Sequence, residues 1–188
     1  MDINYNKITK YDRNVEQLLT FLMWCTVTPG KKSDVITPKF NAMFDDTNKP
    51  SQVIKKHGKS VRSLLEKHGI GQYDRIMKAW KAIKLIQPMG QLRTITRDEL
   101  TTIPGIGPKT ASFFLVHSRK WQEMAVLDVH ILKWLQQQFP GHPIPDSTPQ
   151  DISKYEAVEA LFLGKACQLN LSPADLDNKI WQANSLSK

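Results

Sequence analysis

A lysine and an aspartate are the residues of this chain whose chemistry is most informative. Lys109 stands just after a turn with two glycines, and Asp128 follows nineteen residues later, after the apolar run 125–127. A neutral lysine amine is a nucleophile that can form a Schiff base, provided that burial or nearby charge favours its neutral form. A carboxylate stabilises positive charge that develops nearby, most strongly where water is excluded. The pair therefore suits covalent catalysis.

A purely structural role is the alternative for both residues. Asp128 is a good N-cap for a helix that begins at Val129, and Lys109 would then be a solvated ligand of a phosphate. Capping and catalysis are compatible roles for Asp128.

The turn before Lys109 is suited to binding an anion. Gly105 and Gly107 have no side chains, so a phosphate can approach their amides closely. Pro108 is typical of the first position of a helix, and the amides of that first turn add the positive end of the helix dipole. The sequence therefore predicts an anion site made from backbone groups.

These residues must be positioned by helices. Apolar residues recur at helical spacing along most of the chain, and no sustained alternation of period two is found. We expect roughly eight to ten short helices, separated by turns rich in proline and glycine. The clearest helical patterns are Val15, Leu18, Leu19 and Leu22, and Ile76, Ala79, Trp80 and Ile83.

Two other features bear on organisation. The proline-rich segment 140–149 marks a boundary before a C-terminal part that comprises residues 150–188. On the helix that begins near Tyr73, Arg75, Lys78, Lys81 and Lys84 lie on the side opposite the apolar residues, most simply as a solvated face.

Charge and composition restrict the partners. The net charge is +8, and residues 1–128 carry 21 Lys and Arg against 12 Asp and Glu. A segregated positive field favours polyanions such as nucleic acid. Cys25 and Cys167 are far apart in the chain, which predicts neither a metal cluster nor a disulfide framework. No apolar run approaches the about 20 residues of a membrane span, so we expect an intracellular protein with no membrane partner.

The segment Ile103–Lys109 resembles the helix-hairpin-helix motif of DNA glycosylases, which also occurs as a bare backbone clamp in ligases, polymerases and nucleases. The segment 125–132, Ala-Val-Leu-Asp-Val-His-Ile-Leu, resembles the Val-Asp-x-His stretch of the lyase-competent glycosylases. The resemblance implies that Lys109 attacks C1′ of the sugar, that Asp128 stabilises the developing charge, and that a Schiff base and β-elimination follow. It places His130 against the DNA backbone.

The branch with an iron-sulfur cluster is excluded, because its loop requires four cysteines. The C-terminal part is similar to the small 8-oxoguanine DNA glycosylase/AP lyases first known from archaea and some bacteria, notably in the segment Leu171–Trp181. The resemblance implies a pocket for the damaged base formed by Trp181, Asp177 and the carboxylate of Lys188. It also places Thr28 in the turn that fills the gap left by a flipped base. A flipped base requires an aromatic face and hydrogen-bond acceptors.

The same resemblance predicts the remaining properties. The fold is all-α, a helix-hairpin-helix glycosylase fold of two small helical lobes with the DNA and base cleft between them. Residues 1–188 form one such unit, with one lobe over about 30–135, including the hairpin 100–111, and the other made of 1–29 and 136–188. The residues expected to bind the DNA backbone are Pro104, Gly105, Ile106, Gly107, Thr110, His130, Lys31 and Lys32.

We expect double-stranded DNA with a damaged base as the partner, a monomer, and a location in the cytoplasm or nucleoid, or in host cytoplasm if the source is viral. No organic cofactor or catalytic metal is implied, although hairpin carbonyls of this family can bind a monovalent cation.

Three alternatives remain open at the level of sequence. The chain could be a non-catalytic DNA-binding protein that uses the hairpin as a clamp. It could be a glycosylase for another damaged, mismatched or hypermodified base. It could also be a related scaffold that modifies a base without Schiff-base chemistry.

Overall fold

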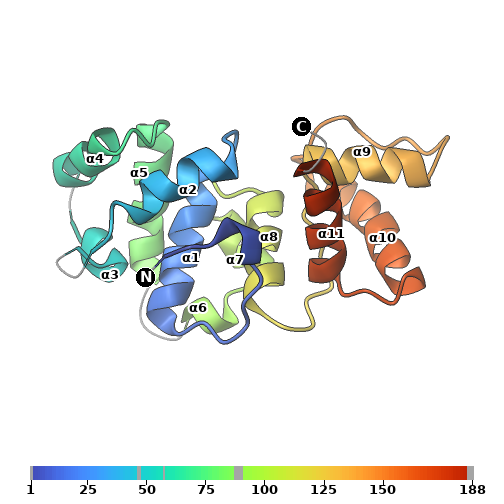
Figure 1. Cartoon of the computed structure of the whole chain (residues 1–188), viewed down its shortest axis with the longest axis horizontal. Coiled ribbons are helices and arrows are strands. Elements are labelled where there is room, and N and C mark those ends of the chain that lie inside the picture. The colour runs from blue at the N-terminus through green and yellow to red at the C-terminus, as the bar shows by residue number, and fades with distance from the viewer. Residues whose placement is uncertain (1, 46–47, 57, 87–90, 186–188) are drawn as a thin grey trace. The chain divides into compact units, whose positions relative to one another are not determined.

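The computed structural model describes residues 2–45, 48–56, 58–86 and 91–185. Its helices, in chain order, are η1 (Tyr5–Lys7), α1 (Val15–Val27), α2 (Ser33–Asn41), α3 (Pro50–Val53), α4 (Gly58–Lys67), α5 (Tyr73–Ile86), α6 (Gln91–Thr94), α7 (Arg97–Thr101), α8 (Pro108–Ser118), α9 (Val129–Gln138), α10 (Ile152–Gln168) and α11 (Pro173–Ser185) (Figure 1). No strand forms within these described ranges, so the predicted all-α class is confirmed. No helix among them is long and apolar enough to cross a membrane.

The chain forms two compact units, residues 1–106 and 107–188. This division differs from the lobes expected from the sequence, which grouped residues 1–29 with 136–188. The physical reason is the packing of α1, whose neighbours include α2, α3, α5 and α6, all within the first unit.

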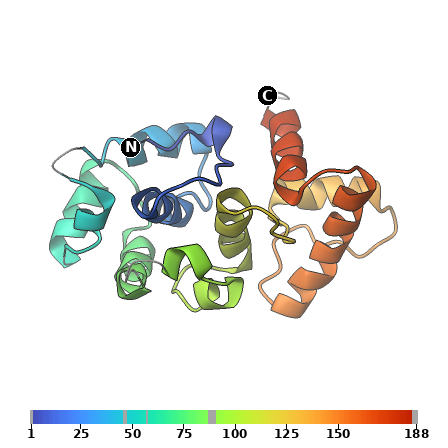
Figure 2. The same cartoon turned by 90° about the horizontal axis from the view of Figure 1, so that it is seen from below.

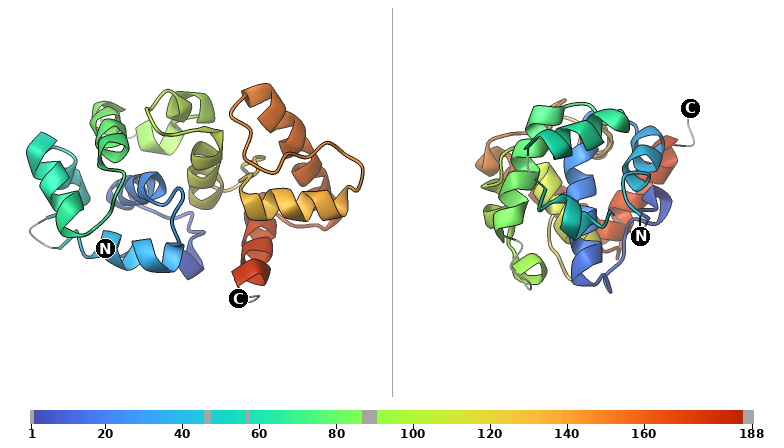
Figure 3. Two further views of the ribbon diagram at one scale, coloured as in Figure 1. Left: turned by 90° about the horizontal axis from the view of Figure 1, so that it is seen from above. Right: turned by 90° about the vertical axis from the view of Figure 1, so that its left-hand side faces the viewer.

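Helix α1 is the centre of the first unit. It begins with a capping box between Asn14 and Gln17, and every residue from Leu18 to Val27 is buried. A helix that is buried all round needs neighbours on every side. Figure 2 looks nearly along α1, with α2, α3, α5 and α6 around it, and the right-hand view of Figure 3 shows it from another side.

Helix α5 packs on α1 with the predicted apolar face. Ile76, Ala79, Trp80 and Ile83 are buried, and Nε1 of Trp80 donates to Oγ1 of Thr26 at 2.9 Å. This hydrogen bond satisfies two polar groups that would otherwise be costly to bury.

The second unit has its own apolar core. Residues of α9, α10 and α11 contribute to it, and these helices lie together in the left-hand view of Figure 3. The core residues are Ala125, Leu127, Ile131, Leu132, Leu135, Ile144, Tyr155, Val158, Phe162, Ala166, Leu176 and Ile180. Helix α11 also contacts α8, so α8 is fixed within this unit.

Candidate active site

Lys109 lies in the first turn of α8. Gly107 is the N-cap residue, with extended backbone (φ −94°, ψ 178°), and Pro108 occupies the first turn ahead of Lys109. No side chain of the N-cap residue covers the start of the helix, which leaves the positive end of the helix dipole open to an external anion. Lys109 is half-buried at this position.

Asp128 is the N-cap residue of α9. Its Oδ1 accepts hydrogen bonds from the backbone amides of His130 and Ile131, both at 2.9 Å. The predicted capping role is therefore present, and the contact fixes the carboxylate at the start of the helix. Both capping bonds fall on Oδ1, so the capping role leaves a chemical role for this carboxylate open.

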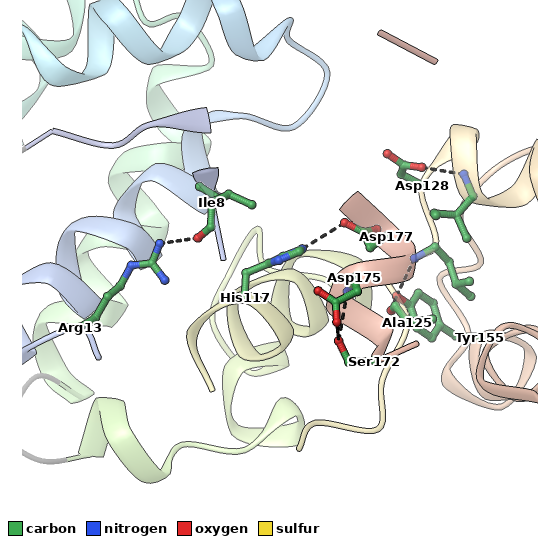
Figure 4. A network of polar contacts seen from close by, with 11 residues as sticks. Ile8, Arg13, His117, Ala125, Asp128, Tyr155, Ser172, Asp175 and Asp177 are labelled. Carbon is green, nitrogen blue, oxygen red and sulfur yellow. Dashed lines mark hydrogen bonds and ion pairs between the residues drawn. The ribbon is translucent and has the colours of Figure 1, made fainter. Parts of the chain in front are cut away.

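The segment 125–127 before Asp128 is held by side chains from α10 and the loop before it. The hydroxyl of Tyr155 donates to the carbonyl of Ala125 at 2.7 Å and accepts from the amide of Leu127 at 3.2 Å. Oε1 of Glu159 accepts from the amide of Ala125 at 2.7 Å, and Oγ1 of Thr148 donates to the carbonyl of Leu127 at 2.6 Å. The backbone leading into Asp128 is thus anchored at Ala125 and Leu127, and Figure 4 shows Tyr155 beside Ala125.

Asp177 is paired with a histidine. Nε2 of His117, on α8, lies 3.0 Å from Oδ2 of Asp177, on α11 (Figure 4). Both side chains are largely buried, and the His117 ring also packs on Phe113 with centroids 4.6 Å apart. With Asp177 ionised, Nε2–H must be the donor. Oδ1 of Asp177 has no hydrogen-bond partner within the described part of the chain.

The electrostatics connect Asp177 to Lys109 and Asp128. Burial raises the pKa of the Asp177 carboxyl, while the hydrogen bond and charge of His117 lower it. The charge of Asp128 also raises this pKa, and that of Lys109 lowers it. A buried carboxyl whose pKa responds to the charges of an amine and a second carboxylate marks a candidate active site.

The other predicted residues of the second unit follow Lys109, Asp128 and Asp177 closely in the sequence. Trp181 is half-buried on α11, one helical turn after Asp177, and Thr110 and His130 are half-buried in the first turns of α8 and α9. Lys188 lies outside the described residues, so its predicted part in base recognition stays a prediction.

The first unit contains the rest of the predicted set. In the hairpin turn, Pro104 and Gly105 are exposed while Ile106 is buried. Oγ1 of Thr28, at the end of α1, donates to the carbonyl of Cys25 at 3.3 Å. Two lysines were also predicted to bind the DNA backbone. Lys31 is half-buried, and Lys32 is exposed at the N-cap of α2.

Sequence reasoning missed several residues of the site. Tyr155 and Glu159 are four residues apart and share a buried face of α10 with Phe162 and Ala166. The sequence signal for Glu159 is thus an acidic residue on the apolar face of a helix. His117 has the same signal on α8, whose residues from Phe114 to Ser118 are all buried. In both cases the sequence indicates that a polar side chain is buried, but it does not indicate which group bonds to it.

Neither a cluster of metal ligands nor a reactive cysteine is found in the described part of the site. Within the described ranges, no group of three or more His, Cys, Asp or Glu side chains is placed to hold a metal ion. Cys25 is buried and Cys167 exposed, both as free thiols, and burial raises the pKa of the Cys25 thiol. A buried thiol of this kind is unreactive.

Comparison with known proteins identifies the motif and the fold. Residues 89–113 match the helix-hairpin-helix motif. The structure is similar to the 8-oxoguanine glycosylase/lyase of Methanocaldococcus jannaschii in complex with DNA containing 8-oxoguanine (TM-score 0.76, 19% identity, 93% of this chain and 83% of that chain). It is also similar to the 8-oxoguanine DNA glycosylase of Thermotoga maritima (TM-score 0.71, 19% identity, 90% of this chain and 80% of that chain). The predicted helix-hairpin-helix glycosylase fold is confirmed.

Proposed function

We propose that this chain is a DNA glycosylase with an associated lyase step, which removes 8-oxoguanine from double-stranded DNA. The observation that carries the proposal is that Lys109, Asp128 and Asp177 belong to one compact unit of this fold, in which the charges of Lys109 and Asp128 act on the pKa of the buried Asp177 carboxyl. The similar enzyme from M. jannaschii is an 8-oxoguanine glycosylase/lyase solved with DNA that contains this lesion, which supports the choice of substrate.

In the proposed reaction, the neutral Nζ of Lys109 attacks C1′ of the damaged nucleotide, and the bond between C1′ and the base breaks. The base leaves with the bonding electrons and takes up a proton. Positive charge that develops on the sugar is stabilised by Asp128, whose orientation is fixed by the amides of His130 and Ile131. The attached amine then loses a proton and the bond between C1′ and O4′ breaks, with O4′ taking up a proton, which opens the sugar ring and gives the Schiff base. Loss of a proton from C2′ then breaks the bond between C3′ and the oxygen of the 3′ phosphate, and the phosphate leaves with the bonding electrons.

Recognition of the base falls to α11 in this proposal. Trp181 offers an aromatic face for stacking, and Oδ1 of Asp177 can accept the N7 hydrogen that oxidation adds to guanine. The proposal also assigns the carboxylate of Lys188 to base recognition, and Thr28 to the turn that fills the gap left by the flipped base. We further propose that the backbone is bound by the hairpin residues 104–107 together with Thr110 and His130.

The proposal includes an intracellular monomer that uses no organic cofactor, catalytic metal or iron-sulfur cluster. A monovalent cation at the hairpin carbonyls is consistent with it.

The test is covalent trapping. The protein is incubated with a duplex that contains one 8-oxoguanine opposite cytosine, and borohydride is added to reduce any Schiff base. Lys109→Gln should abolish the adduct, while Lys133→Gln, which removes an exposed lysine from α9 of the same unit, should leave it unchanged. Parallel duplexes carry undamaged guanine or an abasic site.

Each outcome is informative. An adduct with 8-oxoguanine but not with guanine supports both the mechanism and the substrate. Trapping at the abasic site alone would keep Lys109 as the lyase nucleophile and require a different base as substrate. DNA binding without any adduct would overturn the proposed reaction in favour of a non-catalytic clamp.

A further inference from the structure

Three cations of the first unit gather where three separate segments of the chain meet. Nζ of Lys31 donates to the carbonyl of Val27 at 2.9 Å, which folds this side chain back over the end of α1. Nζ of Lys39, in the last turn of α2, lies over Gly69, 3.6 Å from where a Cβ would stand. Arg75, in the first turn of α5, is the third member.

Arg75 links these segments to the hairpin turn. Its guanidinium donates to the carbonyl of Thr26 at 2.7 Å, to Oε1 of Gln72 at 2.6 Å and, more weakly, to the carbonyl of Gly105 at 3.4 Å. Nε2 of Gln72 in turn lies 3.4 Å from the carbonyl of Pro29. Arg75, expected from the sequence to be part of a solvated face, is instead half-buried and held in place.

The backbone around these cations is unusual. Gly69, Gly71 and Gln72 all have positive φ, of 61°, 71° and 54°. A non-glycine residue in this region carries a conformational cost, which the surrounding contacts must offset. The loop therefore keeps Gln72 against Arg75 at the expense of local strain.

The three cations are not neutralised by the protein. Within the described residues, Lys31, Lys39 and Arg75 form no ion pair with an acid. Burial lowers the pKa of Lys31 to about 8, with further lowering by the charges of Arg75 and Lys39, and burial lowers the pKa of Arg75. Like charges that lie near one another without an acidic partner are typical of a site that is completed by an anionic ligand.

We propose that Lys31, Lys39 and Arg75 form a binding site for one backbone phosphate of the DNA, next to the hairpin turn at Gly105. The inference rests on the proposed function in taking DNA as the ligand. The surroundings favour a polyanion, because residues 1–106 carry 18 Lys and Arg against 10 Asp and Glu, whereas residues 107–188 carry eight of each. The guanidinium then has a double role, since it positions the hairpin turn and contributes charge to the site.

The test measures DNA affinity against salt concentration by fluorescence anisotropy, with an undamaged duplex. Lys31→Gln and Lys39→Gln should each weaken binding several-fold and reduce the slope of log affinity against log salt by about 0.9, the value expected for one lost phosphate contact. Lys81→Gln is the matched control, because it removes the same charge from an exposed position of α5. It should change the slope far less.

A second readout uses the protonation of Lys31. Phosphate binding requires the charged amine, so the affinity of the unmodified protein should fall as pH rises through about 8. This fall should be absent in Lys31→Gln and present in Lys81→Gln.

The proposed site is overturned if Lys31→Gln and Lys39→Gln match Lys81→Gln in the salt slope, or if Lys31→Gln matches it in the pH dependence of DNA affinity. These results are independent of the trapping experiment. A normal adduct with unaltered salt slopes would reject only the phosphate site, whereas altered slopes without any adduct would reject only the glycosylase reaction.

Discussion

Nε2 of His117 and Oδ2 of Asp177 are 3.0 Å apart in a contact that joins α8 to α11 (Figure 4). The helix that carries Lys109 is therefore tied directly to the helix that carries the proposed base pocket. His117 acts in this arrangement as a positioning residue, because it occupies one carboxylate oxygen of Asp177 and leaves the other for a ligand.

Asp177 should make the stability of the protein depend on pH. Burial raises its pKa above the ordinary value of 3.8, so the folded state binds the proton more tightly than the unfolded state. Its contribution to stability is greatest below about 3.8 and is lost as pH rises through the higher folded pKa. Asp177→Asn removes this titration, so its Tm relative to the unmodified protein should increase as pH rises above 3.8.

Thermal unfolding across this range provides the check. Asp175→Asn, at an exposed position of the same helix, is the control and should show no such increase. A Tm difference for Asp177→Asn that is constant with pH would contradict the prediction.

The charge of Asp128 can be separated from its capping role. Asparagine caps a helix about as well as aspartate, so Asp128→Asn should change the free energy of unfolding by no more than a few tenths of a kcal/mol. Loss of the negative charge should reduce the single-turnover rate of base release by about 10²–10³-fold. The matched control is Asp151→Asn, which makes the same change at the N-cap of α10 and should leave the rate unaltered. Equal rates for the two variants would show that capping is the whole role of Asp128.

Tyr155 should support Asp128 through the backbone. Tyr155→Phe removes the hydroxyl that bonds the carbonyl of Ala125 and the amide of Leu127, both in buried residues. Leaving buried polar groups unpaired costs about 1–3 kcal/mol. We expect urea unfolding of Tyr155→Phe to show a free energy of unfolding lower by this amount. We also expect slower base release. Tyr11→Phe, at an exposed position, is the comparison, and a Tyr155→Phe protein of unchanged stability would rule out the anchoring role.

Gly105 should be intolerant of a side chain. Its φ is +84°, and a Cβ would stand 2.9 Å from Cγ of Arg75. Gly105→Ala should therefore destabilise the protein by about 1–2 kcal/mol through backbone strain alone, and it should weaken DNA binding by moving the turn. Gly164→Ala is the control, because this helical glycine has open space around it and should gain about 0.5–1 kcal/mol. Denaturant unfolding of both variants measures these changes. Equal changes in the free energy of unfolding would contradict the prediction.

The helices and the hairpin could be predicted because their determinants are local. The apolar spacing in 15–22 and 76–83 predicted two helices of the first unit, and both form as expected. Pro108 does stand in the first turn of α8, and Asp128 does cap α9. Each of these choices depends on residues within a few positions of one another, where backbone geometry and side-chain hydrogen bonds are decided.

The sequence by itself thus determined the helical class, the hairpin and the candidate pair Lys109 and Asp128. Only the tertiary structure decided the partners of the buried polar groups: His117 with Asp177, sixty residues apart, and Arg75 with Thr26, forty-nine residues apart. It also decided that α1 belongs with residues 30–106. The physical reason is that the spacing of apolar residues shows which side of a helix is buried, whereas the neighbour on that side is chosen by packing between segments distant in the chain.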